Sequence, residues 1–348
     1  MPEPPRSARG ASTNPPNRFE QLHVETDEPR GADVATTYYR DASRSVLADN
    51  DSPDVGFRFS LNPYRGCEHG CSYCYARPTH EYLGFSAGVD FESRIMVKGD
   101  APALLRQALS APRWQPQVVA LSGNTDCYQP VERHLGLTRR CLEVFAEFRN
   151  PVGVVTKSAL VARDADLLGE LASHHAAHVC CSVTTLDPDL ARRMEPRAAQ
   201  PAKRLDASAA LTAAGVPVAV LIGPVIPGLN DAEIPRILAA AKEAGARSAS
   251  WVLLRLPKPV DVLFTRWLAE HFPDRKERVL HRIQDTRAGG MSDSAFGRRK
   301  RGQGEYASQI AALFAAAARK HGLDAPLPPL SADAFRRPLT TGDQLRLW

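Results

Sequence analysis

From about residue 55 onward, short apolar runs alternate with longer amphipathic stretches. The short runs are continuously apolar rather than alternating, which is typical of parallel strands that are covered on both faces. They are rich in β-branched residues, as strands usually are. We therefore predict six strands, within residues 56–62, 117–121, 152–156, 178–185, 216–223 and 248–255.

The stretches between these runs have the spacing of amphipathic helices, at residues 101–110, 131–148, 162–174, 203–214 and 232–245. A strand–helix alternation predicts parallel strands joined by right-handed crossovers. Six units are fewer than the eight of a closed barrel. We therefore predict an α/β fold with a partial (βα)6 TIM-type barrel, and a doubly wound sheet is the alternative.

The pattern divides the chain into three parts. Residues 1–50 are rich in Pro, Arg, Asp, Ser and Thr and lack hydrophobic periodicity, so we predict a mostly disordered arm. Residues 51–258 form the predicted barrel. Residues 259–348 form a C-terminal helical extension, with helices at about 261–285 and 304–321 and a basic, Gly-rich loop between them.

Composition narrows the class of protein. With 348 residues, 43% hydrophobic and 24% charged, the chain is an ordinary globular protein rather than collagen-like, coiled-coil or wholly disordered. No apolar run approaches the roughly 20 residues that span a bilayer, and the N-terminus has no apolar signal region. We therefore expect a cytoplasmic protein without membrane contact, with its seven cysteines reduced.

The net charge of +5 predicts no particular partner. The densest basic cluster is Arg298-Arg299-Lys300-Arg301, in the Gly-rich loop of the extension. Such a run is either a solvated loop or a phosphate-binding segment.

Three cysteines stand close together directly after the first predicted strand, at Cys67, Cys71 and Cys74. The spacing is C-x3-C-x2-C. Thiolates suit iron–sulfur clusters or zinc, and a compact loop with Gly66 and Gly70 allows three sulfurs to converge.

The alternative is a structural zinc site, which normally has four protein ligands. The sequence has no second CxxC pair, but His69 or His80 is close enough in sequence to complete a Cys3His set. A zinc- or iron–sulfur-containing nucleic-acid-binding module without catalysis is therefore the competing hypothesis.

These residues carry a family resemblance. The C-x3-C-x2-C motif with an aromatic residue before its last cysteine, at the end of the first strand of a βα series, resembles the radical S-adenosylmethionine (radical SAM) superfamily. The longer motif from Asn62 to Arg77 and the later Thr125-Asp126-Cys127-Tyr128-Gln129-Pro130-Val131-Glu132 resemble the spore photoproduct lyase-like branch. The resemblance covers about residues 55–255.

The resemblance implies that Cys67, Cys71 and Cys74 hold a [4Fe-4S] cluster whose open iron binds S-adenosylmethionine. Reductive cleavage of that cofactor then gives a 5′-deoxyadenosyl radical, which abstracts hydrogen from a substrate. The cofactors supply this chemistry, and the protein positions them and excludes water and oxygen.

The loops after the other strands supply candidate cofactor contacts, because ligands bind at the carboxyl ends of parallel strands. By the resemblance, the loop with Thr125 and Asp126 lies beside the cofactor, although Asp126 is equally suited to capping the next helix. Lys157 is a candidate partner of the methionyl carboxylate, or else a surface lysine. The remaining candidates are Tyr73 in the cysteine motif, the strand-end Ser182, and Arg197, which we favour over Arg204.

At one position the sequence departs from the resemblance. Gly123 stands where spore photoproduct lyase carries a hydrogen-donor cysteine. Cys127 and Tyr128, in the same loop, are therefore the candidate catalytic residues that return a hydrogen atom. Cys141, Cys180 and Cys181 are expected to be buried small hydrophobic residues.

The substrate is left open between DNA or RNA, which the resemblance implies, and a small molecule or peptide. An electron donor such as flavodoxin or ferredoxin is also implied.

Overall fold

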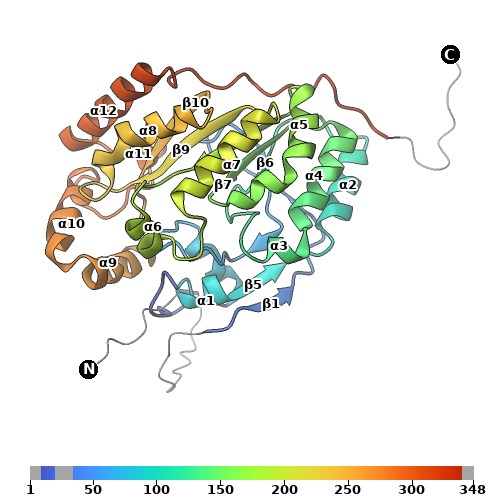
Figure 1. Cartoon of the computed structure of the whole chain (residues 1–348). Coiled ribbons are helices and arrows are strands. Elements are labelled where there is room, and N and C mark those ends of the chain that lie inside the picture. The colour runs from blue at the N-terminus through green and yellow to red at the C-terminus, as the bar shows by residue number, and fades with distance from the viewer. Residues whose placement is uncertain (1–8, 20–33, 339–348) are drawn as a thin grey trace, which may run out of the picture.

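The computed structural model describes residues 9–19 and 34–338. Its main feature is a curved sheet that, within this part of the chain, has seven strands in the order β10-β9-β8-β7-β6-β3-β2 (Figure 1). These are β2 (Leu47–Asp49), β3 (Phe59–Leu61), β6 (Val119–Leu121), β7 (Val152–Thr156), β8 (Ala177–Ser182), β9 (Val218–Val225) and β10 (Ser248–Leu253).

All six predicted strands are confirmed, and neighbouring members pair in parallel from β3 to β10. The strand β2 adds to the edge of β3 in the antiparallel direction. The architecture is thus the predicted α/β partial barrel, with β2 at one edge and β10 at the other.

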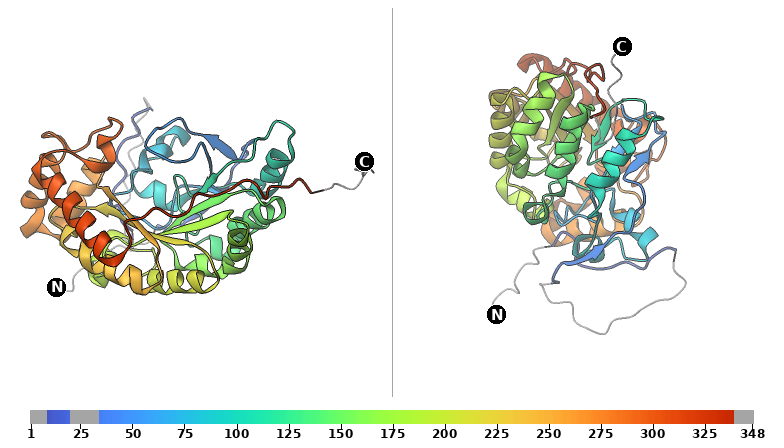
Figure 2. Two further views of the ribbon diagram at one scale, coloured as in Figure 1. Left: turned by 90° about the horizontal axis from the view of Figure 1, so that it is seen from above. Right: turned by 90° about the vertical axis from the view of Figure 1, so that its right-hand side faces the viewer.

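Helices cover the convex face of this sheet (Figure 2). They are α2 (Ala101–Ser110), α4 (Leu137–Phe148), α5 (Ala165–Ser173), α7 (Pro201–Ala213) and α8 (Ile234–Glu243). The predicted helix over 131–148 is broken into α3 (Glu132–Leu135) and α4 by Gly136, whose φ of 60° is left-handed.

The core lies between the sheet and these helices. Strand residues Val154, Val179 and Val218 are fully buried there against helix residues such as Leu142 and Leu171. Each buried aliphatic side chain of this kind contributes about 1.5–3 kcal/mol relative to an exposed one. Because successive strand residues point to opposite faces, the intervening residues of these strands line the concave face, where Val155, Cys180 and Leu221 are only partly buried.

Short elements complete the cysteine region. A second, three-stranded sheet joins β1 (Thr37–Arg40), β5 (Arg94–Val97) and β4 (Tyr64–Arg65). The remaining short elements there and in the following loops are η1 (Arg77–Leu83), α1 (Val89–Ser93), η2 (Ala159–Asp164), α6 (Pro188–Met194) and η3 (Asp231–Glu233).

The C-terminal extension contains α9 (Val260–His271), η4 (Pro273–Arg275), α10 (Lys276–Asp285), α11 (Arg298–Arg301) and α12 (Glu305–His321). Phe264 and Trp267 of α9 share a buried cluster with Cys71 and Tyr73, while Ile310 of α12 packs on the α8 side of the barrel. The extension therefore helps to enclose the cysteine loop.

The structure differs from the sequence prediction at the N-terminus. Residues 9–19 lie against the cysteine loop, and residues 34–50 contain β1 and β2, whereas the composition predicts disorder over 1–50. Residues 9–19 are anchored by hydrogen bonds from the Gly10 and Ala11 amides to Glu92, and Ala11 is buried with Val89 and Leu263. Residues 1–8 and 20–33 lie outside the described part of the chain.

Candidate active site

The cysteine loop directly follows β4 and depends on two glycines. Gly66 has a φ of 79° and Gly70 a φ of 67°, both left-handed conformations that favour glycine. A Cβ on Gly70 would lie 2.7 Å from Oε2 of Glu92. The Cys67 amide donates to the Phe91 carbonyl oxygen over 2.9 Å. The loop is therefore tightly folded against the segment around Glu92.

A buried ion pair contacts the backbone of this loop. Arg77 and Glu92 are both inaccessible to solvent and bind each other. Arg77 also donates through Nη2 to the Cys71 carbonyl oxygen over 2.8 Å. The amides of Gly10 and Ala11 donate to the Glu92 carboxylate over 3.0 and 2.8 Å. The loop backbone and residues 9–19 are thus tied to one charge-balanced pair.

The three cysteines of the motif are free thiols. Cys67 and Cys71 are buried and Cys74 is partly buried. Burial raises the pKa of all three thiols, that of Cys67 well above its usual range. Their thiolate forms therefore require a cationic partner, which the iron ions of a cluster supply. Three reduced sulfurs on one short loop fit an iron–sulfur cluster.

The two histidines of the zinc alternative have other neighbours. Nδ1 of His69 lies 3.4 Å from the Asp126 carboxylate, and His80 packs between Phe85 and Phe91.

A second buried pair links the loop to the strand ends. Glu195, which follows α6, binds Arg204 of α7, and both are almost inaccessible. Tyr73 donates to Glu195, and Oγ1 of Thr184 donates to it over 2.6 Å. Burial alone would raise the pKa of Glu195, but Arg204 and Lys157 outweigh it and lower the pKa to about 2. The carboxylate is therefore charged at neutral pH.

Lys157 follows β7, and its Nζ lies 5.9 Å from the centroid of the Tyr73 ring. It is thus beside the cysteine loop, as predicted for a residue at a strand end. Arg204, ranked second to Arg197 from the sequence, is committed to Glu195. Arg197 instead pairs with Glu68 of the cysteine loop over 3.0 Å and is partly exposed.

The predicted residues of the β6 loop also lie near the cysteine loop. Oδ2 of Asp126 accepts from the Lys157 amide and Oδ1 from the Thr156 hydroxyl, each over 2.8 Å. Thr125 is buried and donates to the Tyr64 carbonyl oxygen over 2.6 Å. Ser182 donates to the Gly223 carbonyl oxygen over 3.2 Å. These side chains hold the strand ends together, so their orientation is fixed.

Cys127 and Tyr128 are not where the sequence predicts them. Cys127 is 0% exposed, within the hydrophobic core that includes Cys141 and Leu142 of α4. Tyr128 is in the same core, and its hydroxyl donates to Asp164 over 3.0 Å. The preceding Asp126 side chain binds the end of β7. This position gives neither residue access to the concave face.

Sequence reasoning missed two residues that build the site. Of the two, only Arg77 could have been found from the sequence, because it stands at the end of the cysteine motif. Glu92 gave none, because it lies in a short helix without a strong pattern.

The sequence model of the radical SAM superfamily matches residues 61–241, more than half of the chain and the part that contains this site. The chain belongs to the radical SAM superfamily. It is 37% identical over 247 residues to an uncharacterized protein of Mycobacterium tuberculosis, covering 70% of this chain and 72% of the relative. An uncharacterized protein of Methanocaldococcus jannaschii is 30% identical over 184 residues, covering 53% of this chain and 66% of the relative.

Solved structures of spore photoproduct lyase share the fold. The enzyme complexed with dinucleoside spore photoproduct has a TM-score of 0.58 at 13% identity, covering 82% of this chain and 79% of the other. A variant of that enzyme has the same TM-score at 16% identity, covering 84% and 85%. The predicted fold and superfamily are confirmed, and this radical SAM protein is a radical-based enzyme. Its described helices include none with the length and apolar character needed to cross a membrane.

Proposed function

We propose that Cys67, Cys71 and Cys74 hold a [4Fe-4S] cluster and that the neighbouring strand ends bind S-adenosylmethionine. When bound, the cluster supplies the electron for reductive cleavage of S-adenosylmethionine to methionine and a 5′-deoxyadenosyl radical. The observation that carries the proposal is the set of three free thiols, two buried and one partly buried, on one loop fixed by the Arg77–Glu92 pair.

In this proposal the chain's own residues bind and orient. Lys157 is a partner for the carboxylate of the cofactor, because its ammonium group lies beside Tyr73 at the cysteine loop. Tyr73, Thr125 and Asp126 shape the same region, and Ser182 and Arg197 border it from β8 and the following loop. Their internal hydrogen bonds fix them in position, so the site is organised before the cofactor binds.

We propose a nucleic acid as the substrate. The support is the fold shared with spore photoproduct lyase, whose structure is complexed with a dinucleoside photoproduct. A flavodoxin or ferredoxin is the proposed electron donor. The free state of all seven cysteines supports a cytoplasmic location.

The test is anaerobic reconstitution with iron and sulfide, followed by an assay for 5′-deoxyadenosine under reductant. We expect product from the wild type and from Cys141→Ala, because Cys141 is a core residue of α4. We expect none from Cys71→Ala. A colourless protein with stoichiometric zinc and no product would refute the proposal.

A further inference from the structure

A basic segment bridges the two edges of the open sheet. We call residues 296–302, which contain α11, the strap. The Gly297 amide donates to Oδ1 of Asp54 over 2.8 Å, Arg299 binds Oδ2 of Asp54, and Lys300 donates to the Asp54 carbonyl oxygen. Asp54 lies between β2 and β3. At the other end of the strap, Arg301 donates to the Trp251 carbonyl oxygen of β10 over 3.0 Å.

The strap carries more positive charge than its contacts neutralise. Six cations gather around it, and their ion-pair partners in the described structure are two carboxylates, Asp54 and Asp293. The cations are Arg255, Arg287, Arg298, Arg299, Lys300 and Arg301. Burial, followed by the neighbouring Arg299, lowers the pKa of Arg255. The excess of like charge favours a bound anion.

This excess lies next to the cysteine loop. The Arg255 guanidinium is 5.3 Å from the centroid of the Tyr75 ring, and Tyr75 directly follows Cys74. Tyr75 is 48% exposed, so this contact is open to solvent. An anion held by Arg255 and the strap would thus lie at the edge of the proposed radical site.

The contacts of the strap with Asp54, which we call the clasp, can be replaced by contacts with a phosphate. The Asp54 carboxylate pairs with Arg299 and the Asp54 carbonyl oxygen accepts from Lys300, and a phosphate offers acceptor oxygens to both cations. Within the strap, α11 is flanked by Gly297 and Gly302, with φ values of 79° and 75°. Phe296, with Arg299 over its ring, is 58% exposed and offers a stacking surface to a base.

We propose that Arg255, Arg299 and Lys300 bind the phosphodiester backbone of a nucleic-acid strand, and that the Asp54 carboxylate occupies Arg299 until phosphate replaces it. The inference rests on the proposed function, because it places the strand beside the radical site. It adds the residues that bind the strand and an internal carboxylate that competes with it.

The test measures binding of a fluorescein-labelled single-stranded oligodeoxynucleotide to the reconstituted enzyme by fluorescence anisotropy at several salt concentrations. Arg299→Gln/Lys300→Gln should bind on the order of tenfold more weakly, and its log Kd–log salt slope should be smaller by about 0.7 for each phosphate that is no longer neutralised. Asp54→Asn should bind several-fold more tightly, because it removes the competitor. A merely structural role for the clasp predicts no gain from Asp54→Asn.

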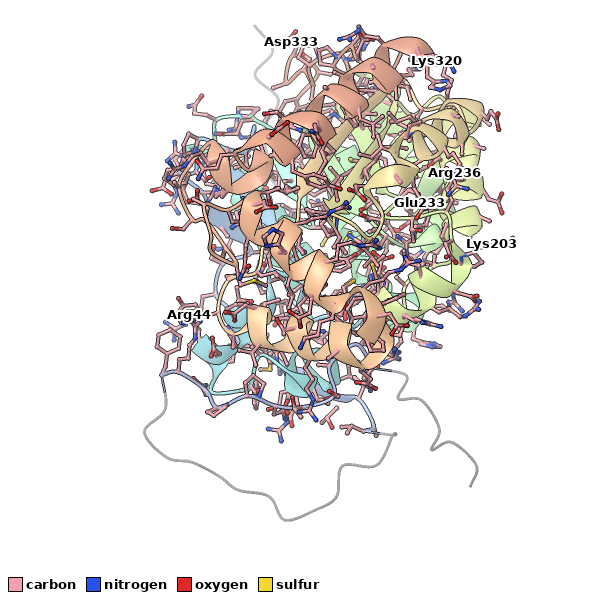
Figure 3. All side chains as sticks on the ribbon, turned by 90° about the vertical axis from the view of Figure 1, so that its left-hand side faces the viewer. Arg44, Lys203, Glu233, Arg236, Lys320 and Asp333 are labelled. Atoms are coloured by element: carbon pink, nitrogen blue, oxygen red, sulfur yellow. The ribbon has the colours of Figure 1, made fainter. Side chains whose placement is uncertain are left out.

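The matched control is Lys203→Gln/Arg236→Gln, which removes the same charge from α7 and α8. Figure 3 shows both side chains at the outer surface, and they are 71% and 72% exposed. An equal loss in this control, or weaker binding by Asp54→Asn, would overturn the proposal. Displacement of the oligonucleotide by polyglutamate at equal charge would instead identify an acidic protein surface as the ligand and also overturn it.

The readouts separate the two proposals. Wild-type enzyme that makes 5′-deoxyadenosine but does not bind the oligonucleotide would refute the strap site alone. Enzyme that binds it in the predicted variant order without cleaving S-adenosylmethionine would refute the radical function alone.

Discussion

Two segments cover the barrel near the cysteine loop, and they are held in opposite ways. Residues 9–19 attach to Glu92, whose charge is balanced by Arg77, and neither side chain of that pair is accessible. The strap attaches to Asp54 through Arg299, which pairs with the carboxylate, and through Lys300, which donates to the carbonyl oxygen. The pair that holds residues 9–19 has no net charge. The cations around the strap outnumber their carboxylate partners.

The difference teaches where to look for function in this fold. Removing one partner of a buried ion pair strongly destabilises the fold, because the other charge is left uncompensated away from water. Such a pair fixes structure. An unbalanced cluster at an accessible edge is completed by a ligand, so its residues are better candidates for binding than for stability.

The largest effect is expected from Glu92→Gln, which leaves the Arg77 charge buried without its partner. The free energy of unfolding should fall by about 3–5 kcal/mol. Urea denaturation followed by circular dichroism measures it. Asp49→Asn removes an exposed partner of Arg58 and should change little. An equal decrease in unfolding free energy in the two variants would contradict the difference between buried and exposed ion pairs.

A second prediction concerns His80, which is buried beside the cysteine loop. Burial lowers its pKa from 6.5 to about 4, so the folded state keeps it neutral while the unfolded state takes up a proton. As pH falls from 6.5 to 4, the unfolding free energy should therefore decrease by up to about 3 kcal/mol through this group.

The His80→Phe variant retains an aromatic ring but does not titrate. Denaturation of the unreconstituted protein across this pH range should show a shallower decline for the variant. Parallel curves for variant and wild type would show that His80 does not contribute.

A third prediction tests the N-terminal covering. A Cβ on Gly10 would lie 1.5 Å from the Gly70 carbonyl oxygen, so Gly10→Ala should displace residues 9–19 from the cysteine loop. The visible absorbance of the reconstituted protein should bleach several-fold faster in air. Gly56→Ala is the control, because nothing lies within 4 Å of its Cβ. Bleaching at the wild-type rate in both variants would contradict a protective role.

The smallest effect on stability is expected from Asp54→Asn, although the same change should tighten oligonucleotide binding. The strap's other contacts, such as that between Arg301 and Trp251, remain in place. A thermal melt should therefore differ far less from wild type than that of Glu92→Gln. A comparable loss would mean that the strap, like residues 9–19, is a fixed structural covering.

The sequence predicts the six parallel strands and the cysteine loop because each leaves a local pattern, an apolar run or a fixed spacing. It does not predict the attachment of residues 9–19, since backbone amides that bind Glu92 leave no trace in composition. The preference for Arg197 over Arg204 likewise missed that Arg204 pairs with Glu195, a partner nine residues away on a preceding loop.

The misplacement of Cys127 has a similar cause. Its position after a strand predicts access to the mouth of the barrel. In the structure Asp126 binds Thr156 and Lys157 at the end of a different strand, and Cys127 lies in the core with Cys141 and Leu142. Side-chain contacts between loops far apart in sequence decide such orientations.

The central claim is that one loop holds a cluster to which S-adenosylmethionine binds. The most direct measurement is electron paramagnetic resonance of the reduced, reconstituted protein with and without S-adenosylmethionine. We predict a [4Fe-4S] signal that the cofactor perturbs in the wild type and in Cys141→Ala, and no such signal in Cys74→Ala. A signal that is unaffected by the cofactor, or that persists in Cys74→Ala, would contradict the account.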